Sequence, residues 1–136
     1  MSVIILQKKT VTPKKRKPPN DYEHQEQVAL FNWAELDRKK YPELSLMFAI
    51  QNARKCPPRM GKYLNDEGRK AGVPDLCLPV SRHGFHALYI ELKTTSGRMQ
   101  PNQIEWQQAL NEAGNLAVTC YGWTHARDSI IEYLKG

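Results

Sequence analysis

Two carboxylates and an amine stand at the ends of two apolar segments, in a spacing that fits chemistry on phosphate. Asp75 follows Pro74 at the start of Pro-Asp-Leu-Cys-Leu, and Glu91 and Lys93 close the segment Tyr-Ile-Glu-Leu-Lys. Residues two apart in a β-strand project from the same face, so Glu91 and Lys93 project together. A strand at each segment therefore presents its charged side chains at one end of an otherwise apolar surface.

A β-hairpin of residues 74–80 and 86–93 brings these side chains together, because the first strand begins where the second ends. Asp75 is then expected opposite Glu91. Two neighbouring carboxylates repel, and a divalent cation removes the conflict. Few oxygen ligands, with positions left for water and phosphate, suit Mg²⁺ or Mn²⁺. A nearby lysine orients an attacking water or stabilises charge at phosphorus. The pattern favours metal-assisted phosphodiester hydrolysis, with an edge-strand salt bridge as the alternative.

Hydrophobic periodicity and turn residues predict the elements that position this cluster. The order is α-β-(α)-β-β-α-β-α, which predicts an α/β (α+β) domain. The expected segments are a helix at 22–38, a strand at 44–50, a short helix at 60–70, strands at 74–80 and 86–93, a helix at 101–113, a strand at 115–121 and a helix at 124–134.

The net charge of +6 lies at one end of the 136-residue chain. Residues 1–20 hold six basic and no acidic residues, and the remainder balances 14 basic against 14 acidic groups. This division predicts a flexible basic arm at 1–20 and a folded domain at 21–136. The arm either contacts phosphates or is a solvated terminus. Its candidate phosphate contacts are Lys14, Lys15, Arg16 and Lys17.

Several motifs in this order resemble one known family. Lys-Ala-Gly-Val-Pro-Asp-Leu at 70–76, Ile-Glu-Leu-Lys at 90–93 and a following Gln-bearing helix resemble the VRR-NUC (virus-type replication-repair nuclease) family of the PD-(D/E)xK superfamily, in its stand-alone, phage-like members. The resemblance covers about residues 22–134. It implies a restriction-endonuclease-like α-β-β-β-α-β core, with a mixed central sheet and a C-terminal helix. It also implies a Mg²⁺- or Mn²⁺-dependent endonuclease acting on branched DNA.

The resemblance also implies a role for each matching residue. Asp75 and Glu91 correspond to metal ligands, and the backbone carbonyl of Leu92 adds another. Lys93 corresponds to the catalytic lysine, and Gln103 to a glutamine that supports the site.

A glutamate from the first helix completes the family's site, and two residues compete for this place. At about 100° per residue, Glu23 shares the sheet-facing stripe with Gln27, whereas Glu26 falls to the flank. We therefore expect Glu23 to serve the site, directly or through a water on the metal, with Glu26 as a solvated charge. Gln27 is either a supporting residue or a plain structural amide.

Further cations and hydroxyls near the predicted site are candidate DNA contacts, with ordinary solvation as the alternative. They are Arg54, Lys55, Arg59, Lys62, Lys70, Thr94, Ser96 and Arg98.

The resemblance implies a homodimer that resolves four-way (Holliday) junctions, and one small domain with one active site needs two copies for symmetric cutting. The helices supply apolar residues for such a contact, including Trp33, Ile131 and Tyr133. The alternatives are a non-catalytic DNA-binding module, a restriction-type enzyme, and a flap or single-strand nuclease. No apolar run predicts a membrane span, and no Gly-rich phosphate loop predicts a nucleotide cofactor. We expect an intracellular protein, in the bacterial host's cytoplasm for a phage-derived member.

Overall fold

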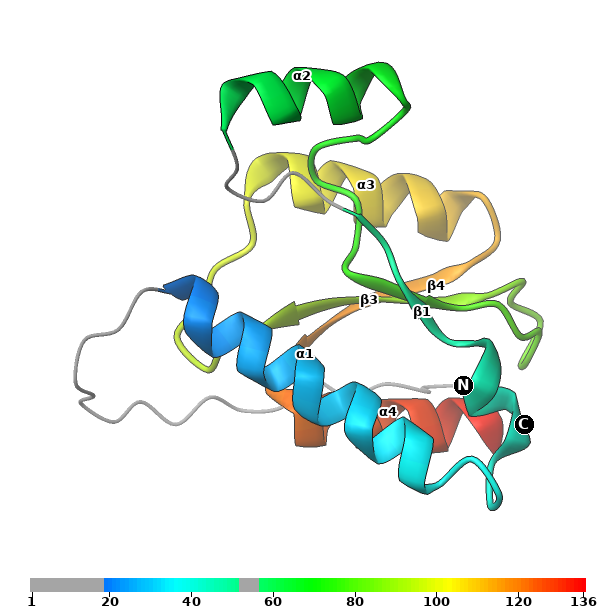
Figure 1. Ribbon diagram of the computed structural model, residues 1–136. Coiled ribbons are helices and arrows are strands. Elements are labelled where there is room, and N and C mark those ends of the chain that lie inside the picture. Colours follow the sequence, from blue (N-terminus) through cyan, green and yellow to red (C-terminus); the bar gives the residue numbers. More distant parts are fainter. Residues whose placement is uncertain (1–18, 52–56) are drawn as a thin grey trace.

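The computed structural model describes residues 19–51 and 57–136, with the side chains from residue 22 on, and has the predicted order of elements (Figure 1). Four helices and one short 3-10 helix alternate with four strands. The elements are α1 (Pro19–Leu36), η1 (Pro42–Leu46), β1 (Phe48–Ala49), α2 (Pro58–Asp66), β2 (Leu76–Leu78), β3 (Leu88–Lys93), α3 (Pro101–Glu112), β4 (Leu116–Tyr121) and α4 (Trp123–Leu134).

The four strands form a mixed sheet in the order β1-β2-β3-β4. β2 pairs antiparallel with β1 and β3, and β4 pairs parallel with β3. The parallel pair requires a crossover connection, which α3 supplies. The predicted α+β fold is therefore confirmed, including the hairpin, in which Leu76 pairs with Ile90.

The two faces of the sheet are covered differently. α1 and α4 cover one face, and α3 lies on the other (Figure 1). Even-numbered residues of β2 and β3 point to the first face and join the fully buried side chains Leu30, Ile130 and Tyr133. In the described part of the chain, no helix is both long and apolar enough to span a bilayer.

The prediction of a first strand at residues 44–50 is wrong over most of this range. A 3-10 helix occupies residues 42–46, and only Phe48 and Ala49 pair with β2. Pro42 favours the first turn of a helix, and the Ser45 hydroxyl donates to the Pro42 carbonyl at 2.6 Å. The apolar run at 44–50 could not reveal this local turn, because short apolar runs suit either structure.

The hairpin turn also holds the end of α4. His83 and Gly84 both have positive φ and join Arg82 to Phe85 in a two-residue turn. The His83 ring lies 2.9 Å from the Tyr133 carbonyl oxygen, among carbonyls that a helix leaves without partners at its end. His83 therefore has a structural partner, the carbonyl of Tyr133 at the end of α4.

Gly72 allows a close approach between the segment before Asp75 and α3. Its φ is +90°, and a Cβ atom there would lie 2.8 Å from the backbone oxygen of Asn102. Real Cβ atoms do not approach backbone that closely, so Gly72 positions the chain against the start of α3.

We expect Gly72→Ala to destabilise the protein more than Gly68→Ala. Both glycines have positive φ, but a Cβ at Gly68 meets no atom within 4 Å. Gly68→Ala should lower the free energy of unfolding by about 1–2 kcal/mol through backbone strain alone. Overpacking should make Gly72→Ala worse by a further ~1–3 kcal/mol in denaturant titrations. Equal losses would contradict the close approach to Asn102.

Candidate active site

The Asp75 carboxylate adds a hydrogen bond to β3 just before the first residue of β2. The Asp75 N–H donates to the Ile90 carbonyl, and the Leu92 N–H donates to Asp75 Oδ2 at 2.7 Å. The β2–β3 pairing ends at Leu76 and Ile90, so the Asp75 side chain supplies the acceptor that a strand carbonyl would otherwise provide to Leu92. Because N–H and C=O of one strand residue point to the same side, the Leu92 carbonyl also points toward Asp75.

Glu91 lies on the α3 face of the sheet, where its two carboxylate oxygens have different surroundings. Oε2 accepts a hydrogen bond from Gln103 Nε2 at 3.0 Å and lies 3.5 Å from Lys93 Nζ. Oε1 is fully buried and has no hydrogen-bond partner among the described residues. Such an atom is costly in a protein interior, and it marks a place for a donor or a cation.

The three charged groups of the predicted cluster are nearly enclosed. Asp75, Glu91 and Lys93 are 5%, 4% and 5% exposed. Burial, and then the negative charge of Asp75, raise the pKa of Glu91 from 4.5 to about 8 against the opposing effect of Lys93. The hairpin therefore brings together the residues that the sequence predicts to converge.

The two glutamates of α1 that compete for the site, Glu23 and Glu26, have separate environments. The charge of Glu23 contributes to the raised pKa of Glu91, so Glu23 lies close enough to act on the cluster. Glu26 instead accepts the Trp123 N–H at 2.6 Å, at the N-terminus of α4. A carboxylate there satisfies an unpaired donor and the helix dipole. The expectation that Glu26 is a solvated charge is therefore wrong.

Gln103 is held by a second bond that aims its amide at Glu91. The Gln100 N–H donates to Gln103 Oε1 at 2.8 Å, at the start of α3. The amide nitrogen of Gln103 consequently faces the sheet and donates to Glu91. Helix capping and orientation of Glu91 are thus done by one side chain.

A polar stripe on α3 continues this arrangement, and sequence reasoning missed it. Gln107 donates to Thr119 Oγ1 at 3.2 Å, and Asn111 exchanges two hydrogen bonds with the backbone of Ala117. These residues follow Gln103 at intervals of four, so they share one helix face. That spacing of amides was the available signal.

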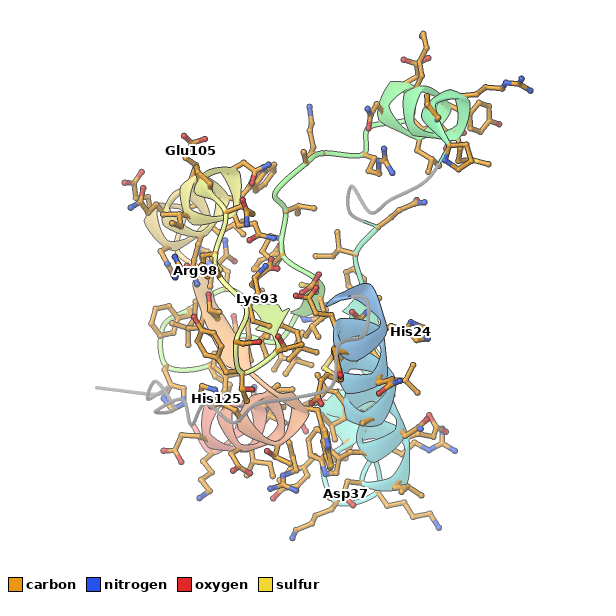
Figure 2. All side chains as sticks on the ribbon, turned by 90° about the vertical axis from the view of Figure 1, so that its left-hand side faces the viewer. His24, Asp37, Lys93, Arg98, Glu105 and His125 are labelled. Atoms are coloured by element: carbon orange, nitrogen blue, oxygen red, sulfur yellow. The ribbon has the colours of Figure 1, made fainter. Side chains whose placement is uncertain are left out.

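The remaining predicted residues surround this end of the sheet or are not described. Figure 2 looks toward the end of β3 and labels Lys93, with Arg98 from the loop that follows. Thr94 is half-buried, Ser96 and Arg98 are exposed, and Gln27 is half-buried on α1. Arg59, Lys62 and Lys70 are exposed on or near α2. Lys14, Lys15, Arg16, Lys17, Arg54 and Lys55 lie outside the described residues.

The donor set suits a hard cation with few protein ligands. Within residues 19–51 and 57–136, no three His, Cys, Asp or Glu side chains group as they would around a fully protein-bound metal. Mg²⁺ does not need such a group, because it keeps several waters and takes one or two carboxylates. Asp75, the unpartnered Oε1 of Glu91 and the Leu92 carbonyl are oxygen donors of that kind.

The raised pKa of Glu91 predicts that metal-free protein loses stability as pH rises. The native state holds the Glu91 proton up to about pH 8, whereas the unfolded chain releases it near its ordinary pKa of 4.5. In EDTA, the unfolding free energy of wild type relative to Glu91→Gln should fall by up to ~1.4 kcal/mol per pH unit between about pH 5 and 8, then level off. Urea titrations measure this, with the exposed Glu35→Gln as control. A pH-independent difference would refute the raised pKa.

Comparison with known proteins agrees with this geometry. The family model of the VRR-NUC domain matches residues 17–123. A solved structure described as a VRR_NUC domain protein has 28% sequence identity and a TM-score of 0.69, with 83% of this chain and 88% of that chain covered. No curated protein matches the chain. Members of the VRR-NUC family are generally nucleases, and they typically depend on a divalent metal. The chain therefore belongs to the VRR-NUC domain family.

Proposed function

We propose that the protein is a Mg²⁺- or Mn²⁺-dependent, structure-selective DNA endonuclease that hydrolyses phosphodiester bonds. The observation that carries this proposal is the unpartnered buried Oε1 of Glu91, close to the charge of Asp75 and beside Lys93. The salt bridge with Lys93 uses Oε2 alone, which leaves Oε1 available to a cation. Family membership adds DNA as the expected substrate.

Asp75 and Glu91 would hold the ion with the Leu92 carbonyl, and Glu23 would act through a water. When bound, the ion neutralises charge on the phosphate and lowers the pKa of a bound water. Gln103 and Lys93 engage Oε2 of Glu91, which would leave Oε1 available to the ion. Gln103 is thus a positioning residue for a ligand atom.

Lys93 supplies a positive charge that stays beside the reacting phosphate. Its stem is packed under the turn after β3, where a Cβ on Gly97 would lie 3.3 Å from Lys93 Cβ. The ammonium group is buried and lies 3.5 Å from Glu91 Oε2, which restricts its position. It either orients the attacking water or donates to the phosphate oxygens as charge develops in the transition state.

Symmetric cutting of a four-way junction requires two copies, and we propose a homodimer. Tyr133 does not serve the contact, because it is fully buried and its hydroxyl donates to the Val80 carbonyl at 2.6 Å. The exposed apolar side chains lie elsewhere. Val28 of α1 lines a 330 Å³ cavity with Ile50, two residues beyond the half-exposed Phe48 of β1. We assign the dimer contact to this α1–β1 face.

Cleavage should require the metal and each of three side chains. Wild type is expected to cut a four-way junction with Mg²⁺ or Mn²⁺ and to leave it intact in EDTA. Asp75→Asn keeps an acceptor for Leu92, Glu91→Gln keeps the shape, and Lys93→Met keeps the stem. Each should lower the cleavage rate by roughly 100-fold or more. Gel assays on junction, flap, splayed-arm and duplex DNA measure rate and preference.

The control is Glu35→Gln, which removes an exposed carboxylate of α1 and should cut at the wild-type rate. If wild type binds branched DNA but leaves every substrate intact with both metals, the chain is a DNA-binding module. Cleavage that depends on a short base sequence would instead indicate a restriction-type enzyme.

A charge placed on the α1–β1 face should separate the dimer. Phe48→Glu is expected to sediment as a monomer at concentrations where wild type sediments as a dimer, because desolvating a carboxylate in an apolar contact is unfavourable. Leu36→Glu, at the 82% exposed end of α1, should not change the oligomeric state. A dimeric Phe48→Glu protein would contradict the assigned surface.

A further inference from the structure

The α2 arm, residues 57–73, stands away from the rest of the molecule. Both figures show α2 set apart from the other helices, and the chain that follows α2 leads back to the sheet (Figures 1 and 2). No residue of α2 is buried, and α2 forms no extensive contact with any other described helix or strand. Met60 and Tyr63 are 48% and 62% exposed. The apolar side of α2 therefore packs extensively against no other described helix or strand.

The arm is nevertheless stabilised by its own hydrogen bonds and by an ion pair. Arg69 donates to Asn65 Oδ1 at 3.0 Å and to the Gly61 carbonyl at 3.3 Å, which ties the outgoing chain to the helix. Lys62 and Asp66 form an ion pair one turn apart at 3.0 Å. A nine-residue helix is marginal on its own, so these bonds hold it in place for a contact outside the fold.

The arm rises directly from the candidate active site. Its outgoing end leads through Pro74 into Asp75, and Gly72 lies against Asn102 beside Gln103. Ile50, which precedes the arm in the sequence, is held at the same point, because its N–H donates to the Asp75 carbonyl at 2.8 Å. A strand of DNA bound at the site therefore passes close to the base of the arm.

The exposed face of α2 has the chemistry of a nucleotide contact. Met60, Tyr63 and Leu64 recur at i, i+3 and i+4, and Arg59 is one turn from Tyr63 on the same side. Aromatic and thioether side chains stack on unpaired bases, and neighbouring cations contact the backbone phosphates. The arm carries four basic and two acidic residues, and Arg59 and Lys70 form no ion pair with a described residue.

We propose that the α2 arm binds nucleotides whose bases are unpaired or unstacked at a branch point, next to the cleaved phosphate, with Tyr63 and Met60 against a base and Arg59 on a phosphate. This proposal rests on the proposed nuclease function and names the part of the substrate that the arm reads. A second copy of the chain fits the face less well, because two arms of net positive charge would repel.

The test measures binding in EDTA, so that it does not depend on cleavage. The probes are a splayed-arm DNA with 2-aminopurine at the first unpaired position and a blunt duplex of equal length. Wild type should quench the splayed-arm probe by stacking. Tyr63→Ala with Met60→Ala should lose the quenching and bind this probe about tenfold more weakly, while affinity for the duplex stays unchanged.

Three controls keep the result interpretable. Tyr63→Phe retains the ring and should behave as wild type, and Leu36→Ala removes an exposed apolar side chain elsewhere. Circular dichroism should show that the double variant unfolds at the wild-type temperature.

Wild-type quenching and affinity in the double variant would overturn the proposal, as would a change in its sedimentation, which would assign the face to a contact between copies. Failure of wild type to cut DNA with either metal would overturn the nuclease function alone, since stacking is read without metal.

Discussion

The hydrogen bond from the Leu92 N–H to the Asp75 carboxylate is the contact on which the candidate site depends. It holds Asp75 beside Glu91 and turns the Leu92 carbonyl to the same side, so three oxygen donors share one edge of the hairpin. The β2–β3 pairing ends at Leu76 and Ile90, and the Asp75 side chain supplies the acceptor beyond this point. Asp75 thus has a structural role in the hairpin as well as its place in the candidate site.

The two faces of the sheet hold their helices by different kinds of interaction. α1 and α4 bury the apolar residues of β2, β3 and β4, which accounts for most of the hydrophobic stabilisation. α3 is held instead by directional hydrogen bonds from Gln103, Gln107 and Asn111. Such bonds fix the rotation and register of a helix more narrowly than apolar packing does, so α3 presents the Gln103 amide to Glu91 in one orientation.

Features that follow from strand alternation or helical periodicity could be predicted from the sequence. Contacts with residues distant in the sequence could not. Strand alternation was sufficient to place Asp75 opposite Glu91, and helical phase separated Glu23 from Glu26. The role of Glu26 at the start of α4 was not predictable, because its partner is 97 positions away. Gln103 came only from the family resemblance, since nothing in its spacing shows that the Gln100 N–H orients it. The 3-10 helix at Pro42–Leu46 was lost in an apolar run that suits a strand equally well.

The bond between the Ile50 N–H and the Asp75 carbonyl closes the chain on itself at the base of the α2 arm. Everything between these two residues is therefore an excursion whose ends are already joined, and lengthening or exchanging it adds little closure entropy. Substitutions on the exposed surface of α2, unlike those at Gly72, leave the carboxylates in register. The surface of α2 can thus vary without moving Asp75 or Glu91.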